Sequence, residues 1–188
     1  MAILDVITLP NPVLRQKARP VTRFDGDLQR LIDDMIETMR KAPGVGLAAP
    51  QVGVPLQLAV IETLPDMDEE GKEIEGTRDL YVIVNPEVIW TSRDMTDGVE
   101  GCLSIPGYLG EVARPDSIRV KALDRYGRKV RLRLYDWDAR IFQHEIDHLS
   151  GVLYIDKLTA AENFWTEEAF HEKFVKSGEA EPETAVGD

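Results

Sequence analysis

QHEIDHLSG, residues 143–151, places two histidines four residues apart just before a Ser-Gly pair that ends a helix. At that spacing His144 and His148 project from one helix face, where both imidazoles can reach a single metal ion. Glu145 lies about 100° around the helix from His144. It therefore stands beside such a metal and can take the proton of a reacting water. The segment predicts two of the ligands of a catalytic metal site.

A catalytic site of this kind usually takes a third protein ligand and leaves one position for water. Cys102, in EGCLSIPG (100–107), is the first candidate, because Gly101 lets the backbone come close and a thiolate is a strong soft ligand. Two other interpretations stay open for this lone cysteine. It is a small buried hydrophobe, or it is a nucleophile with a histidine base.

Glu168 is the rival third ligand. It follows His148 by twenty residues, and a downstream glutamate completes the zinc site of thermolysin-like endopeptidases. Glu172, four residues further, would then be an acid that orients a ligand. This interpretation leaves the EGCLS segment unexplained.

A third segment, GVGLAAPQVG (44–53), combines glycines that permit close backbone approach with an amide donor at Gln51. Ala48 and Ala49 leave room beside it. The alternative is a plain turn between a helix and a strand, and the segment lacks the pattern of a dinucleotide-binding loop.

In the rest of the chain, the periodicity of the hydrophobic residues predicts an α+β fold. We expect mixed, mainly antiparallel sheets packed around the central helix that carries the HExxH motif, with N-terminal and C-terminal helices. The predicted helices cover about 28–41, capped by Asp25, about 138–149, and about 160–176. The predicted strands cover 56–62, 80–90, a hairpin of 117–123 with 130–135, and 152–158.

Composition supports one catalytic domain, residues 1–177, followed by an acidic, disordered tail, 178–188. The chain has 188 residues, a net charge of −12 and one cysteine. The negative charge argues against nucleic acid and anionic lipid as partners, and no apolar run is long enough for a membrane span. A lone thiol and the absence of a signal-like start favour the bacterial cytoplasm.

In this order, GVGLAAPQ, EGCLS and QHEIDHL resemble the three signature segments of the peptide deformylases, GxGxAAxQ, EGCxS and QHExDHL. The resemblance covers roughly residues 5–157. It implies metal-dependent hydrolysis that removes the N-formyl group from the formyl-methionine of nascent polypeptides and releases formate.

The resemblance also implies roles for individual residues. Cys102, His144 and His148 would bind the metal, Glu145 would be the general acid/base, and Gln51 with the Leu103 backbone N–H would hold the oxyanion. The implied substrate-binding residues are Val45, Gly46, Gly101, Trp137 and Ile141, of which Val45, Trp137 and Ile141 would form an apolar methionine pocket.

The implied cofactor is one divalent metal, Fe²⁺, with Zn²⁺, Ni²⁺ or Co²⁺ as substitutes. The implied partners are N-formyl-methionyl nascent peptides, which the enzyme would meet in a transient ribosome encounter.

Two features of this sequence differ from some family members and concern substrate contact and ribosome docking. Tyr108 and Leu109 stand where some members carry a substrate-contacting Arg, and the C-terminus is acidic where some bacterial members carry a basic ribosome-docking helix. A non-catalytic module that binds peptide termini is the alternative from another functional class.

Overall fold

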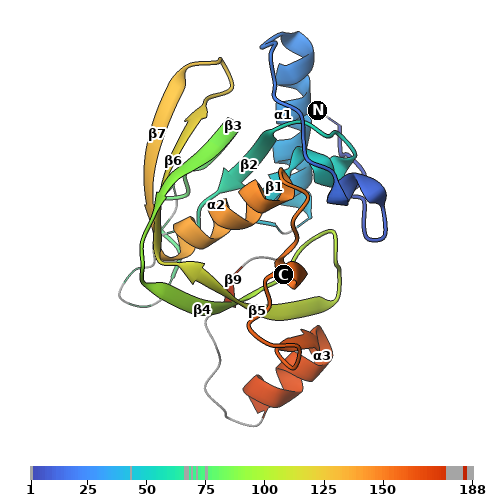
Figure 1. Ribbon diagram of the computed structural model, residues 1–188, viewed down its shortest axis with the longest axis vertical. Helices are drawn as coiled ribbons and strands as arrows, with labels where there is room; N and C mark the ends of the chain where they lie inside the picture. Colours follow the sequence, from blue (N-terminus) through green and yellow to red (C-terminus); the bar gives the residue numbers. More distant parts are fainter. Residues whose placement is uncertain are drawn as a thin grey trace.

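The computed structural model describes residues 2–42, 44–65, 68, 70, 72–74, 76–176 and 184–185. It confirms the α+β fold: two sheets enclose a central helix, α2 (Asp136–His148), which carries both histidines of the motif (Figure 1). Within the described residues, no helix is long and apolar enough to cross a lipid bilayer.

The larger sheet has the strand order β1-β2-β3-β6-β7, and every neighbouring pair is antiparallel. Its strands are β1 (Gly46–Ala48), β2 (Leu58–Glu62), β3 (Leu80–Thr91), β6 (Ser117–Leu123) and β7 (Lys129–Tyr135). Ile118, Val120 and Leu134 alternate with exposed residues and pack on Phe142 of α2. The predicted hairpin of 117–123 with 130–135 is therefore confirmed, and its apolar face covers the central helix.

The smaller sheet has the order β8-β5-β4-β9. Its strands are β8 (Phe164–Thr166), β5 (Tyr108–Pro115), β4 (Met95–Glu100) and β9 (Thr184–Ala185). β4 ends two residues before Cys102, so this sheet fixes the position of that thiol. β9 is parallel to β4 at Val99 and Glu100. The other residues of the predicted tail, 178–183 and 186–188, lie outside the described residues.

Helix α1 (Gly26–Lys41) packs against β1 and β2, and the Asp25 side chain caps it by accepting a hydrogen bond from the Leu28 N–H, as predicted. The short helices are η1 (Pro12–Arg15), η2 (Ala49–Val52), η3 (Tyr154–Asp156), α3 (Glu167–Phe170) and the π-helical η4 (His171–Lys176).

Two predicted elements differ from the structure. The strand predicted at 152–158 contains the 3-10 helix η3 instead, because the Asp156 side chain accepts a hydrogen bond from the Leu153 N–H at 2.8 Å and closes a turn. The last helix begins at Glu167 rather than near 160, since Thr166 caps it and residues 164–166 pair with β5. The strands β4 and β5 were not predicted.

Candidate active site

Cys102, His144 and His148 form one buried cluster, in which the three ligand atoms all lie within 4.8 Å of one another. The Cys102 Sγ is 3.4 Å from the His148 Nε2. Both histidines come from adjacent turns of α2, and the cysteine comes from the loop after β4. The sheet and the helix therefore converge on the set of residues that the motifs predicted.

The chemistry of this donor set fits a metal ion. A thiol and two imidazoles in a buried site suit zinc, iron and related transition metals. Among the described residues, the buried side-chain polar atoms without a hydrogen-bond partner are Glu145 Oε2 and the Nδ1 of His148, whose Nε2 faces Cys102. Buried polar atoms are rarely left unpaired, so the Glu145 oxygen indicates a place for a ligand or water.

The rival ligand Glu168 is exposed on α3, which lies below the smaller sheet in Figure 1, away from α2. The metal-binding cluster found among the described residues contains Cys102 in its place. The structure therefore gives no support to the endopeptidase-like ligand set.

A buried carboxylate fixes the orientation of His144. The Glu100 Oε2 lies 2.9 Å from the His144 Nδ1, which leaves the other ring nitrogen for the cluster. Arg114 donates to both oxygens of Glu100, at 2.6 and 2.8 Å, and Arg140 donates to Oε1 at 2.9 Å. Burial alone would raise the pKa of Glu100, but Arg114 and His144 hold that pKa well below its usual range.

This network continues to the surface and was not predicted from the sequence. Arg114 also donates to Asp147 at 2.8 Å, and Asp147 pairs with Lys157 at 2.7 Å. Gly98 makes room for Arg140, because a Cβ there would lie 2.8 Å from the guanidinium carbon. The available signal was a pair of arginines, Arg114 and Arg140, in apolar surroundings, where a buried cation requires a buried anion.

Glu145 is 1% exposed and lies against the backbone of Gly46. Burial raises the pKa of Glu145 to about 7. A Cβ on Gly46 would lie 2.8 Å from the Glu145 Cγ and closer still to its carboxylate. Gly46 therefore provides the space that the carboxylate occupies.

Gln51 is buried, and hydrogen bonds orient its amide. The side-chain oxygen accepts from the Ala48 N–H at 2.8 Å, so the amide nitrogen faces the Cys102 Sγ at 3.6 Å and the Ser104 Oγ at 3.4 Å. No described residue accepts a hydrogen bond from the Leu103 backbone N–H. Two donors thus lie near Cys102, and of these the Leu103 N–H has no acceptor among the described residues.

The N-terminal segment ties the two donor-bearing loops together. The Ile7 N–H donates to the Gln51 carbonyl at 2.8 Å, and the Leu9 N–H donates to the Ser104 carbonyl at 3.1 Å. No role was predicted for this segment, because the residues that it contacts are distant in the sequence.

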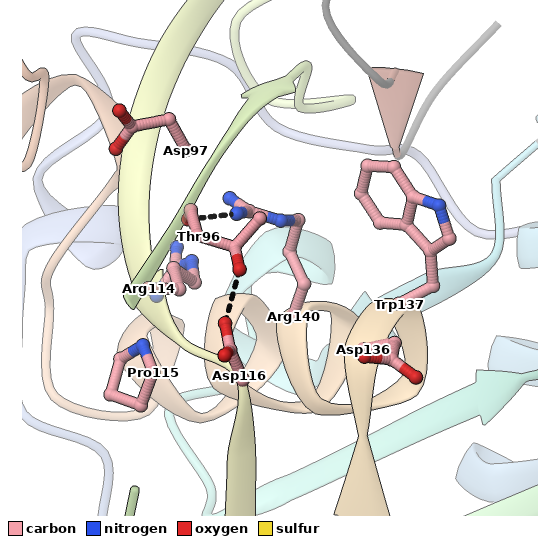
Figure 2. A pocket seen from close by; sticks show the side chains of 8 residues that line it. All are labelled: Thr96, Asp97, Arg114, Pro115, Asp116, Asp136, Trp137 and Arg140. Carbon is pink, nitrogen blue, oxygen red and sulfur yellow. Dashed lines mark hydrogen bonds between the residues drawn. The ribbon is translucent and has the colours of Figure 1, made fainter. Parts of the chain in front are cut away.

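The predicted substrate-binding residues are not all brought together. Gly46 and Gly101 are buried close to the cluster. Val45 and Ile141 pack in the core around Phe142. Trp137 lines a cavity (Figure 2) beside Arg140 and the polar residues Thr96, Asp97, Asp116 and Asp136. This cavity is too polar to match the predicted apolar pocket, whose composition remains a prediction.

The family profile described as Polypeptide deformylase matches residues 3–164. The chain belongs to this family. The peptide deformylase of Symbiobacterium thermophilum is 49% identical over 159 residues, which are 85% of this chain and 68% of that protein.

Solved deformylases share the fold. The crystal structure from Legionella pneumophila has a TM-score of 0.75 and 40% identity, and covers 96% of this chain and 100% of that one. A structure from Acinetobacter baumannii, described as bound to Met-ala-ser, has a TM-score of 0.74 and 33% identity, and covers 84% and 99%. This deformylase is thus a metal-dependent hydrolase whose Cys/His/His site is typical of its family.

Proposed function

We propose that this deformylase removes the formyl group from formyl-methionine at the amino termini of nascent polypeptides and releases formate. We place this reaction in the bacterial cytoplasm, with a transient encounter at the ribosome. The observation that carries the proposal is the convergence of three separate segments on one buried cluster. Gln51 lies next to Cys102, Cys102 clusters with His144 and His148, and the Glu145 side chain lies against Gly46.

The open edge of β1 supports a peptide as the substrate. The Val45 carbonyl accepts a hydrogen bond from the Glu62 N–H at 2.8 Å, so the alternation of an antiparallel ladder turns the backbone groups of Gly46 away from β2. An extended peptide can pair with them as an added strand. The Acinetobacter baumannii relative bound to Met-ala-ser supports peptides that begin with methionine as the substrate class.

The residues around the cluster suit hydrolysis of a formamide. Held by Cys102, His144 and His148, the metal would supply Lewis acidity. Glu145 accepts a proton from the attacking water as the water oxygen forms a bond to the formyl carbon. The carbon–nitrogen bond then breaks, and Glu145 returns the proton to the departing amine. Negative charge on the formyl oxygen is met by the Gln51 amide and the Leu103 N–H, and one such donor contributes roughly 3–4 kcal/mol.

Ferrous iron is the metal that we propose, with zinc, nickel or cobalt as substitutes. A thiolate ligand donates more charge than an imidazole and weakens the Lewis acidity of zinc. Protein prepared without oxygen and loaded with Fe²⁺ should therefore have a higher kcat than the same protein loaded with Zn²⁺.

Formate release from formyl-Met-Ala-Ser, measured together with metal content, tests the assignment. Cys102→Ala should lose both the metal and the activity. Glu145→Gln should keep the metal and lose activity by several orders of magnitude. Glu168→Ala is the matched control and should keep both. Metal and activity retained in Cys102→Ala would remove Cys102 from the metal site, and full activity after complete chelation would show that the reaction does not need the metal.

A further inference from the structure

The β6–β7 hairpin is strongly basic although the whole chain is acidic. Residues 117–135 contain seven Lys or Arg and one Asp, in a chain whose net charge is −12. The cations are Arg119, Lys121, Arg125, Arg128, Lys129, Arg131 and Arg133. Positive charge is therefore concentrated on one element, which lies at the left of the molecule in Figure 1.

The strand register places like charges directly opposite one another. Arg119 pairs with Arg133, and Lys121 pairs with Arg131, all with exposed side chains. The residues between them face the core and pack against α2. Like charges at opposed positions destabilise a sheet, so this arrangement lowers the stability of the hairpin. It is expected where an anion binds to that face.

Most of these charges lack a nearby carboxylate. Lys121 pairs with Glu87 at 2.8 Å, and the Arg119 guanidinium lies 4.9 Å from the ring of Trp90, which is 46% exposed. Lys129, Arg131 and Arg133 form no ion pair with any described residue. They recur at every second position of an edge strand, about 6.8 Å apart at a rise of about 3.4 Å per residue.

We propose that this basic face, made of Arg119, Lys121, Lys129, Arg131 and Arg133 with Trp90 at its border, binds the phosphate backbone of folded RNA. A regular row of cations matches a regular row of phosphates, and the guanidinium groups can each contact two phosphate oxygens. Trp90 offers a ring on which an unpaired base can stack.

The spacing of the cations and the exposed aromatic rings favour RNA over an anionic membrane. Phosphates recur regularly along a nucleic-acid backbone, and Trp90, Tyr126 and Tyr135 are exposed rings on which unpaired bases can stack. The acidic groups that make the whole chain negative act weakly at a distance, since charges more than about 10 Å apart are largely screened at 0.1 M salt. The net charge of the chain therefore does not describe this surface. The inference is also independent of the proposed reaction, because the reactive cluster lies beyond the opposite face of the hairpin.

Fluorescence polarisation of a labelled RNA duplex, titrated with the metal-loaded full chain over a range of salt concentrations, tests this proposal. The variant is Lys129→Gln/Arg131→Gln/Arg133→Gln. The control variant, Lys17→Gln/Arg23→Gln/Lys41→Gln, removes the same charge from exposed positions elsewhere. Both should keep the wild-type Tm and formate release from a short formylated peptide.

We expect the hairpin variant to bind RNA at least tenfold more weakly, and the control variant to stay within twofold of the wild type. The slope of log affinity against log salt should fall in magnitude by about two to three, because each phosphate that is no longer neutralised reduces it by roughly 0.7–0.9. Equal weakening in both variants, or no RNA binding by the wild type at low salt, would overturn the proposal. So would tighter binding to phosphatidylglycerol vesicles, or self-association that the hairpin variant abolishes.

Discussion

Gly46 is buried in β1, and its importance to the site is steric. The position that its side chain would occupy belongs to the Glu145 carboxylate. Gln51 is constrained in a comparable way, since one hydrogen bond to the Ala48 N–H decides which end of its amide faces Cys102. The geometry of the site therefore depends on the absence of a side chain at Gly46 and on the orientation of the Gln51 amide.

Gly46→Ala should therefore displace Glu145 and reduce kcat by about two orders of magnitude, the contribution typical of a positioned acid/base. Metal content should not change, because Gly46 is not one of the three ligands and the atoms nearest to an added Cβ all belong to Glu145. Steady-state formate release and metal analysis check this.

Gly53→Ala is not a suitable control for this variant, since Gly53 has φ +77° and an alanine at that position would be strained. Ala42→Gly, at the half-buried C-cap of α1, serves instead. A Gly46→Ala enzyme with wild-type kcat would show that Glu145 tolerates the methyl group.

At the scale of elements, the Glu100–Arg114–Arg140 network joins β4, β5 and α2. Glu100 is 0% exposed and Arg114 is 2% exposed, so neither charge can be solvated if its partner is removed. Removing one member of a buried ion pair costs roughly 3–5 kcal/mol. The network thus holds the strand that leads to Cys102 against the helix that carries the histidines.

Arg114→Met should lower the free energy of unfolding by about 3–5 kcal/mol, because Glu100 keeps Arg140 but loses its bidentate partner. Arg15→Met is the matched control, since it removes an exposed pair with Asp156 whose expected contribution is about 0–1 kcal/mol. Urea unfolding of both variants measures the difference. Similar losses for the two would mean that Asp147 and Arg140 rearrange to compensate.

Glu100→Gln tests how the same network affects the affinity of the site for its metal. An amide at this position keeps a hydrogen bond to the His144 Nδ1 but removes the charge that sets the basicity of the ring. Loss of such a supporting partner typically weakens metal binding by about 10–100-fold. Competition with a chelator of known affinity would measure the change, and an unaltered metal affinity would confine Glu100 to a structural role.

For the molecule as a whole, the metal should act as a bridge between the smaller sheet and the central helix. Its ligands come from the loop after β4 and from α2, so binding stabilises only the folded state. Such a ligand adds about 2.7 kcal/mol at a hundredfold excess over its Kd. Chelation should lower the Tm of the wild type, and should leave the Tm of Cys102→Ala unchanged in calorimetric scans.

The parts that were predictable from the sequence are those encoded locally. The His144–His148 pair follows from helical spacing, and the alternating residues of 117–123 and 130–135 predict their hairpin. β4 was missed because Thr96, Asp97 and Gly98 carry no apolar alternation: its strand conformation depends on pairing with β5 and on the room that Gly98 leaves for Arg140. Trp137 and Ile141, four residues apart on one helix, lie in different surroundings that helical spacing cannot distinguish.

The open edge of β1 is three residues long, and this has a consequence for when the enzyme acts. An unpaired edge this short cannot recruit the strands of other folded molecules, which protects the protein from aggregation through that edge. Under the proposed pairing with Gly46, this edge accepts only a free, extended chain end. A polypeptide whose first residues have already been built into its own sheet or core would not pair with Gly46. We therefore predict that processing comes before the client protein completes its tertiary structure.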